Sequence, residues 1–360
     1  MALTTPERSP MDVMQALAQL ELTRYLAGVD LSGADLSGQN LSNCHFEGIR
    51  FLGANLSGIK FDGSVFQNCD LTGAQLPGAS LAGVQMMTAS LRDAQLQSAR
   101  AQGANFSSVD FSSACAPSAD FSAAMFDACI FDNADMSGAK WVKADCNECI
   151  FRGTNFMQTD LTRCTLIETD LSSVRLDRTC LVQAYLKSCN LARLRFTECD
   201  VTMAIFDNAN LQNTNFSNVV LDRTSFIAAQ MQGAVLTGAK GQFTALLEAN
   251  LSHADLQHSE FEMSDASDAD FTGARCDSSH WFQSVLMRSK LGQVNFTAAS
   301  FKECDLSHAD LSAANFSRAS VVGCNLHAIN TSNTGWDGAR RSNNRETDVA
   351  LAKAEQWQAA

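Results

Sequence analysis

The chain has 360 residues and a formal net charge of −13 at pH 7; 46% of its residues are hydrophobic and only 18% are charged. This balance excludes a disordered chain, a collagen and a disulfide scaffold. No apolar run approaches the roughly 20 residues of a transmembrane helix, and the start of the chain lacks the apolar segment of a cleaved secretory signal. We therefore expect a cytoplasmic protein that has no membrane partner.

Residues 1–28 are predicted to form an N-terminal capping helix. Ser9 is a suitable N-cap, Pro10 suits the first helical position, and Asp12 would lie in the first turn. The apolar residues that follow recur at helical spacing, namely Met14, Leu17 and Leu20.

From Val29 to Gly338 the sequence repeats every five residues, through 62 pentads without an insertion or deletion. We number the five slots of each pentad −2 to +2 around a central residue such as Leu36. In slot 0, 55 of the 62 residues are Leu, Phe, Met, Val or Trp, and in slot −2, 57 are Ala, Cys, Ser, Thr or Val. Side chains alternate along an extended segment, so these two slots point inward together. Slots +1 and +2 are rich in turn-forming residues.

The pentads resemble the pentapeptide-repeat family, whose motif is A(D/N)LXX. The motif stands here at 54–58, 104–108, 134–138 and 269–273, for example as Ala54-Asn55-Leu56-Ser57-Gly58. The resemblance covers residues 29–338. It implies an all-β fold, a right-handed quadrilateral parallel β-helix with four pentads per coil and about 15 coils. Residues 20 apart in sequence would then stack on each other. The family also implies a bacterial protein.

Residues 339–360 are predicted to form a C-terminal helix or tail. Residues 340–344 have the composition of a polar connector, and Thr347 is a suitable N-cap for a helix through Leu351 and Trp357. We expect both terminal helices to cover open sheet edges, which otherwise promote aggregation.

Of the thirteen cysteines, eleven fall in the inward slots, and only Cys115 and Cys180 fall in slot −1. A buried free cysteine behaves as a small hydrophobic residue, so core filling is the first interpretation. Cys146 and Cys149 form a C-x-x-C pattern, but the second ligand pair of a zinc site is missing. Two pairs would stack on adjacent coils, where a disulfide is conceivable, although buried thiols fit a reducing compartment better: Cys129 with Cys149, and Cys304 with Cys324.

No pattern of catalytic residues is found. The six histidines all fall in outward slots, and no nucleophile elbow, P-loop or dinucleotide fingerprint is present. The acidic residues around 260–270 would lie on a convex, solvated surface, whereas catalytic carboxylates need a concave and desolvated site. We predict a protein that is not an enzyme, with no catalytic residue, cofactor or metal.

The apolar residues outside the core slots are more informative. Twenty of the 22 phenylalanines occupy slot 0, and Phe243 and Phe282 do not. An alternative for Phe243 is that it folds inward, because Gly241 leaves slot 0 without a side chain. Outward apolar clusters mark interfaces. We predict an interface with a protein partner or a second copy at Phe243, Leu247, Met263, Phe282, Val285 and Met287.

The resulting function is a non-catalytic, rigid protein–protein interaction scaffold. Two alternatives come from the resemblance, since some members mimic DNA and bind a type II topoisomerase (gyrase), and others accompany bacterial secretion systems. Asp110 and Asp170 would lie in one row of a DNA-mimicking face, but Ile130 and Ile150 fall between them. The acidic charge also disfavours binding to nucleic acid.

Overall fold

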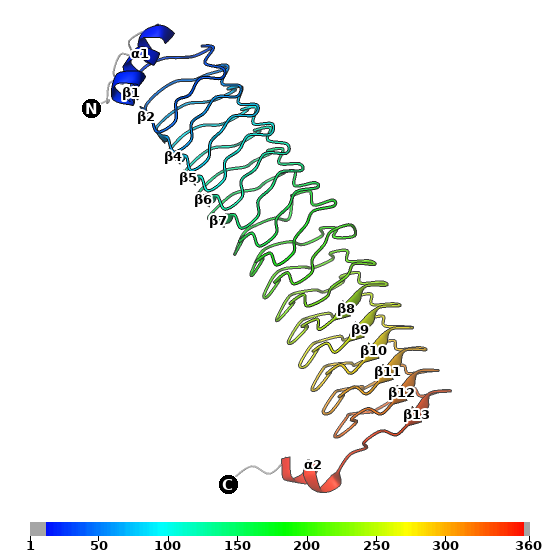
Figure 1. Cartoon of the computed structure of the whole chain (residues 1–360). Helices are drawn as coiled ribbons and strands as arrows, with labels where there is room; N and C mark the ends of the chain where they lie inside the picture. Colours follow the sequence, from blue (N-terminus) through cyan, green and yellow to red (C-terminus); the bar gives the residue numbers. More distant parts are fainter. Residues whose placement is uncertain (1–11, 356–360) are drawn as a thin grey trace, which may run out of the picture. The chain divides into compact units, whose positions relative to one another are not determined.

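The computed structural model describes residues 12–355 and comprises two compact units, Met1–Cys180 and Leu181–Ala360 (Figure 1). Four pentads complete one turn, and residues 20 apart stack in register, as Leu26 does on Phe46. The chain forms a parallel β-solenoid of about 16 turns, which confirms the predicted all-β repeat fold. Among the described residues, helices occur only at the two ends.

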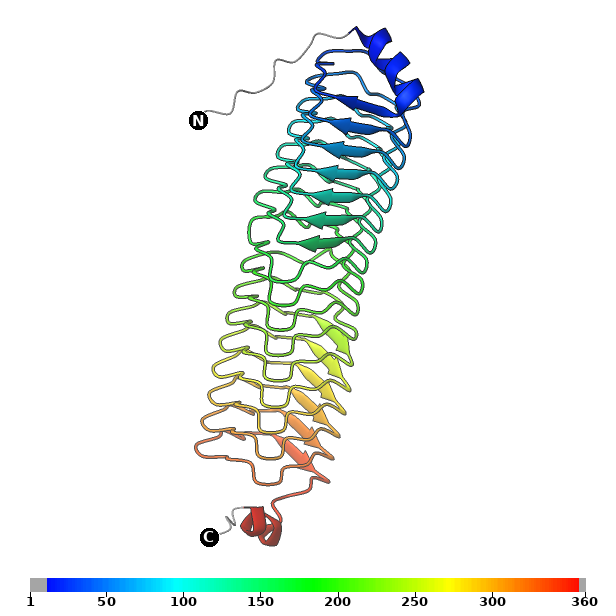
Figure 2. The same ribbon diagram turned by 90° about the vertical axis from the view of Figure 1, so that its left-hand side faces the viewer.

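The first unit begins with helix α1 (Val13–Thr23), which packs on the first strand. Seven short strands follow in a parallel sheet whose order is the chain order (Figure 2). Isolated β-bridges join other sides of the coils, for example Asp30 with Arg50. The strands are β1 (Tyr25–Ala27), β2 (His45–Glu47), β3 (Val65–Gln67), β4 (Gln85–Met87), β5 (Asn105–Ser107), β6 (Met125–Asp127) and β7 (Asp145–Asn147).

The second unit carries a six-stranded parallel sheet, again in chain order, and ends with helix α2 (Val349–Glu355). Neighbouring strands keep the 20-residue register, as Phe261 pairs with Trp281. The strands are β8 (Lys240–Gln242), β9 (Glu260–Glu262), β10 (His280–Phe282), β11 (Ser300–Lys302), β12 (Ser320–Val322) and β13 (Arg340–Ser342).

The predicted inward slots fill the interior of both units. Slot 0 phenylalanines stack from coil to coil; the rings of Phe196 and Phe216 have centroids 4.5 Å apart and lie within 2° of parallel. Polar residues in slot −2 are satisfied by backbone, since the hydroxyl of Thr154 donates to the carbonyl of Phe131 at 2.8 Å. A buried hydroxyl with a partner avoids the cost of an unsatisfied polar group.

The corners explain the Asp or Asn of the motif. The carboxylate of Asp110 in slot −1 accepts the backbone N–H of Ser112 at 2.8 Å, and this Asx contact recurs along the chain. Slot +2 adopts the left-handed conformation, with φ of +67° at Gly153. Many non-glycine residues share this conformation, but a Cβ on Gly153 would also lie 2.6 Å from the side-chain oxygen of the stacked Asn133, so glycine avoids both the backbone strain and this contact.

At the N-terminal end the helix begins later than Ser9. The N-cap of α1 is Asp12, whose carboxylate accepts the N–H of Met14 at 3.4 Å; Ser9 and Pro10 lie outside the described residues. Leu20 is buried, as the helical spacing suggests, whereas Met14 is 71% exposed because its side of the helix faces away from β1.

The strand ladders extend beyond residues 29–338 at both ends. Leu26, one pentad before the predicted start, is fully buried in slot 0. Residues 340–344 were predicted to be a connector, but β13 pairs with β12 there. Arg341 takes slot 0 of that last coil and is exposed, with its guanidinium 4.7 Å from the ring centroid of Trp336. A terminal coil tolerates this charge because no further coil covers it.

Helix α2 is capped by Asp348 and not by Thr347. The carboxylate of Asp348 accepts the N–H groups of Ala350 and Leu351 at 2.9 and 3.0 Å. The hydroxyl of Thr347 instead accepts the N–H of Ala328 at 3.1 Å, which ties the start of α2 to the solenoid. Trp357 lies outside the described residues.

Candidate functional site

Phe243 and Met263 form the most exposed part of the predicted interface. Both occupy slot +2 at the corner that follows β8 and β9, in left-handed conformations with φ of 58° and 46°. Their side chains are stacked one coil apart, and they are 45% and 37% exposed. The alternative that Phe243 folds inward is therefore wrong. The space beside Gly241 is already occupied, since a Cβ there would collide with the hydroxyl of Thr244 and approach the ring of Phe261.

Phe282 lies on β10 in slot +1, where it is half-buried. Each of the two outward phenylalanines carries a cation over its ring. The ammonium of Lys302 is 4.9 Å from the ring centroid of Phe282, and the guanidinium of Arg223 is 5.3 Å from that of Phe243. One face of each ring is thus already covered by a cation of the protein itself.

The remaining predicted residues lie on the next side of the coil and are not brought together. Val285 is half-buried, and its neighbours in the same row are Asp265 and Asp305. Leu247 and Met287 share a slot two coils apart, with the buried Ser267 between them. The six residues therefore cover two sides and one corner of the second unit, and only Phe243 and Met263 are direct neighbours in one row.

Sequence reasoning missed a groove of about 470 Å³ on the outer side of β8–β10. Its floor includes Gly241 and Phe261, and its ends are marked by Val220 and Phe282. Val220 is 50% exposed in a slot that usually holds Asp, Asn or another polar residue, and this exception was the available signal.

The rim of the groove is acidic. Glu260 pairs with Lys240 at 3.0 Å, and the carboxylate of Asp222 accepts the N–H of Gln242 at 2.9 Å. Within the described part of the chain, the carboxylate of Glu262 makes no hydrogen bond or ion pair. A cation would find an unused partner there.

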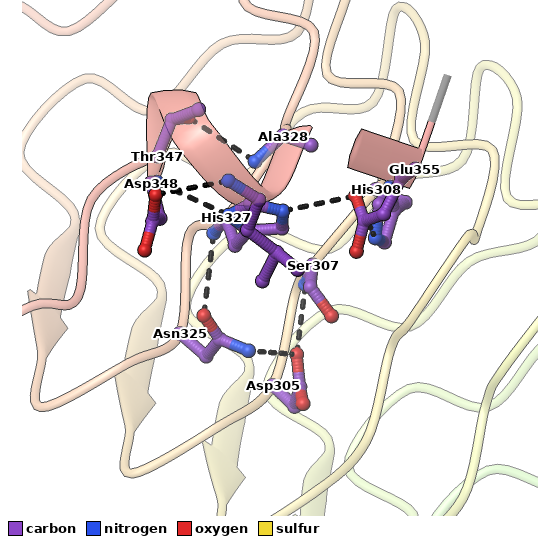
Figure 3. Close-up of polar contacts among 10 residues, drawn as sticks. Asp305, Ser307, His308, Asn325, His327, Ala328, Thr347, Asp348 and Glu355 are labelled. Carbon is purple, nitrogen blue, oxygen red and sulfur yellow. Dashed lines mark hydrogen bonds and ion pairs between the residues drawn. The ribbon is translucent and has the colours of Figure 1, made fainter. Parts of the chain in front are cut away.

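A second cluster joins α2 to the last coils (Figure 3). The Nε2 atom of His327 lies 3.1 Å from a carboxylate oxygen of Glu355, and the Nε2 atom of His308 lies 3.6 Å from the same oxygen. Sequence reasoning missed this cluster because Glu355 comes from the helix outside the repeat. Two imidazoles and a carboxylate are a donor set that could hold zinc.

The hydrogen bonds of His327 favour a clamp over a metal site. Its Nδ1 atom accepts the N–H of Asp348 at 3.2 Å, so the neutral ring carries its proton on Nε2 and donates it to Glu355. A metal bound at Nε2 would require Nε2 to be deprotonated, so that the proton of the neutral ring would move to Nδ1. Nδ1 could then no longer accept the N–H of Asp348. His327 is only 5% exposed, and it holds both ends of α2 against the solenoid (Figure 3).

The thiols are mostly core residues. Cys115 and Cys180 are half-buried, as expected, but Cys199 is also half-buried although its slot points inward. The other ten are buried, and burial raises the pKa of the Cys69 thiol to about 11. A thiol that resists ionisation is a poor nucleophile and metal ligand.

A parallel solenoid with a five-residue period, a filled interior and variable outward slots defines a β-solenoid repeat protein. The family described as pentapeptide repeats (8 copies) matches segments that together span residues 30–178, 204–240, 242–279 and 289–327. The chain belongs to the pentapeptide-repeat family. No curated protein matches it.

Three structures of repeat proteins are similar to parts of the chain. HetL, involved in heterocyst differentiation regulation in the cyanobacterium Nostoc, is 23% identical, with 73% of this chain and 96% of HetL covered and a TM-score of 0.30. A trypsin-treated form of QnrB1, a plasmid-mediated fluoroquinolone resistance protein, is 14% identical, with 53% and 92% covered and a TM-score of 0.34. A protein from the thylakoid lumen of Arabidopsis thaliana is 21% identical, with 33% and 68% covered and a TM-score of 0.16.

Neither of the two helices in the described range is long and apolar enough to cross a bilayer.

Proposed function

We propose that this chain is a non-catalytic interaction scaffold that binds a protein partner through the second unit, at β8–β10 and the adjoining corner. The observation that carries the proposal is the exposure of Phe243 and Met263 beside the groove on β8–β10. Exposing stacked large apolar side chains in water is unfavourable, and such patches are commonly covered by partners. Their backbone is held by the inter-coil hydrogen bonds, so the surface is already ordered before binding.

We consider mimicry of DNA for gyrase binding the weaker candidate. In one row of the first unit, Asp30 pairs with Arg50 at 3.5 Å, and Asp110 pairs with Arg92 at 3.0 Å. The next residue of the row is Ile130. Two of the three carboxylates in this row, those of Asp30 and Asp110, are neutralised, and an apolar residue follows. Such a row is a poor imitation of a phosphate backbone, which carries regularly spaced negative charge.

We also infer a cytoplasmic location. The stacked Cys129 and Cys149 remain thiols, as do the stacked Cys304 and Cys324, and buried thiols suit a reducing compartment.

The test is crosslinking of the purified full chain in host extract, followed by identification of the crosslinked partner. Phe243→Ser combined with Met263→Ser should abolish one specific crosslink, because aromatic and apolar anchors dominate binding energy. Met125→Ser, a matched change at a residue 51% exposed in the first unit, should leave that crosslink intact. Equal crosslinking by all three proteins would reject the proposed surface. Inhibition of purified gyrase by equimolar protein would favour the DNA mimic instead.

A further inference from the structure

The groove on β8–β10 has two rows of outward side chains and a backbone floor between them. Slot −1 contributes Lys240, Glu260 and His280, and slot +1 contributes Glu262 and Phe282. The three strands lie side by side (Figure 2). The groove therefore runs across the strands, from Val220 at one end to strand β10, with His280 and Phe282, at the other.

The strand backbones cannot recognise an incoming chain by adding a strand. The N–H groups of Lys240, Glu260 and His280 already donate to the preceding coil at 3.0, 2.9 and 2.8 Å. The strand pairs use the backbone groups between them in parallel ladders. β-Augmentation needs an open edge. An occupant of this groove must be recognised by side chains.

Charge selects a cationic occupant. Three carboxylates line the groove, at Asp222, Glu260 and Glu262, against the single lysine Lys240, which already pairs with Glu260. The carboxylate of Glu262 has no such partner in the range 12–355. A positively charged side chain placed there would gain an ion pair without breaking one.

Apolar surface selects what accompanies the cation. The ammonium of Lys302, from the following strand, covers one face of the Phe282 ring at 4.9 Å, so an incoming cation would use the face on the side of Glu262, from the preceding strand. Arginine fits best, because a planar guanidinium can stack on Phe282 and bind the carboxylate of Glu262 through two N–H groups. At the other end, Val220 is 50% exposed and offers a contact for an aliphatic side chain.

The length follows from strand spacing. Val220 and His280 are three coils apart, or about 14 Å at ~4.8 Å per coil, and an extended peptide covers this with four to five residues at ~3.3 Å each.

We propose that this groove binds an extended segment of a partner protein in which an arginine and an aliphatic residue stand about four residues apart. The inference rests on the proposed scaffold function and names the chemistry of its partner. The arginine lies between Glu262 and Phe282, and the aliphatic side chain covers Val220.

The experiment is fluorescence anisotropy with the full chain and a labelled synthetic peptide, Ser-Arg-Ser-Ser-Ser-Leu-Ser. Replacing its arginine by lysine should weaken binding several-fold, and replacing it by glutamate should abolish binding. Glu262→Gln and Phe282→Ala should each weaken binding of the arginine peptide about tenfold, the size of one lost charged or stacking contact. Glu248→Gln makes the same change of net charge at a corner away from the groove and should leave the affinity unchanged.

Five outcomes would overturn the proposal. Equal weakening by Glu262→Gln and Glu248→Gln would mean non-specific attraction to an acidic protein. Equal affinity for the arginine and lysine peptides would remove the role of the planar guanidinium, and no binding at millimolar peptide would remove the site. A dimer in analytical ultracentrifugation that Phe282→Ala dissociates would assign the groove to a second copy. If the peptide does not bind but the crosslink to a partner still depends on Phe243, the groove is rejected and the proposed scaffold function is retained.

Discussion

The two units have the same kind of interior and differ in the side chains that they display outside. Phe126 in the first unit and Phe216 in the second are both completely buried in slot 0 and stacked on aromatic rings of neighbouring coils. Outside, β5–β7 carry mostly short polar and acidic side chains around one exposed methionine, Met125, beside a groove of about 320 Å³. The strands β8–β10 carry instead an ion pair, the unpaired carboxylate of Glu262 and Phe282, beside a groove of about 470 Å³. The comparison teaches that stability and recognition use different slots of the same pentad, so either can change without the other.

The strongest way to break this separation is a charge in slot 0. Phe216→Asp should unfold the coils around it, because an unpaired buried carboxylate costs several kcal/mol. Asn215→Asp changes its neighbour in an outward slot, and its free energy of unfolding should stay within about 0.5 kcal/mol of the wild-type value. Thermal unfolding monitored by circular dichroism provides the measurement. Similar melting of the two variants would mean that the inward and outward slots are not distinct.

A second test concerns the one glycine in slot 0. The repeat pattern alone suggests that Gly241→Leu would improve the core, whereas the structure predicts destabilisation by about 1–3 kcal/mol. The reason is that Thr244 and Phe261 already occupy the space beside Gly241. Chemical denaturation against a Gly78→Leu variant would separate overpacking from the cost of a strained corner, since Gly78 has a positive φ of +65° and no atom within 4 Å of its Cβ position. A stabilised Gly241→Leu variant would contradict the packing described here.

A third test sharpens the contrast between repeat and cap. His327→Ala should release α2, because it removes the acceptor of the Asp348 N–H and the donor to Glu355. Each such hydrogen bond contributes about 1 kcal/mol. Hydrogen exchange should accelerate in residues 349–355 and remain unchanged in β8–β10. His308→Ala should have a smaller effect, since His308 lies 3.6 Å from the carboxylate of Glu355, farther than the 3.1 Å of His327. Unchanged exchange in α2 would mean that other contacts hold the helix.

The finest distinction comes from thiol labelling, which measures the accessibility of each cysteine in the native protein without changing the sequence. A bulky reagent should modify Cys115, Cys180 and Cys199 in the native protein, because these three are half-buried and the rest are buried. The inward slot of Cys199 predicts that its thiol is protected from the reagent, whereas its half-buried position in the structure predicts labelling. Its labelling rate therefore distinguishes the two predictions. Mass spectrometry after brief labelling gives the rates, and rapid modification of Cys304 would contradict both.

The pentad pattern predicted the interior because inward positions repeat under one constraint. Phe216 and Leu26 are buried by the same rule, although Leu26 precedes the predicted start. The rule failed where neighbours decide. Arg341 is tolerated in slot 0 only because it lies in the terminal coil, and Phe243 stays outside because Thr244 and Phe261 leave no room.

The candidate sites were harder to predict because they depend on contacts between coils and with the cap. The groove arises from Val220, Glu262 and Phe282, which lie 20 to 62 residues apart in sequence. The clamp joins His327 to Glu355, which lies outside the repeat and has no slot. A periodic pattern predicts whether each side chain points inward or outward, but not which side chains from other coils or from the terminal helix it contacts.

The 20-residue register has a consequence for how such a chain can change in length. Within a unit, deleting 20 residues removes one whole turn and leaves each remaining side chain on its former side, as the pairing of Phe261 with Trp281 implies. Deleting five residues instead carries every later side chain around to the adjacent side. Gene duplications and losses in steps of one turn would therefore lengthen or shorten an existing surface, such as the rows that contain Glu260 and Glu262, whereas single-pentad steps would scatter it. Natural variation in this solenoid should be quantised by the coil, although the sequence repeats by the pentad.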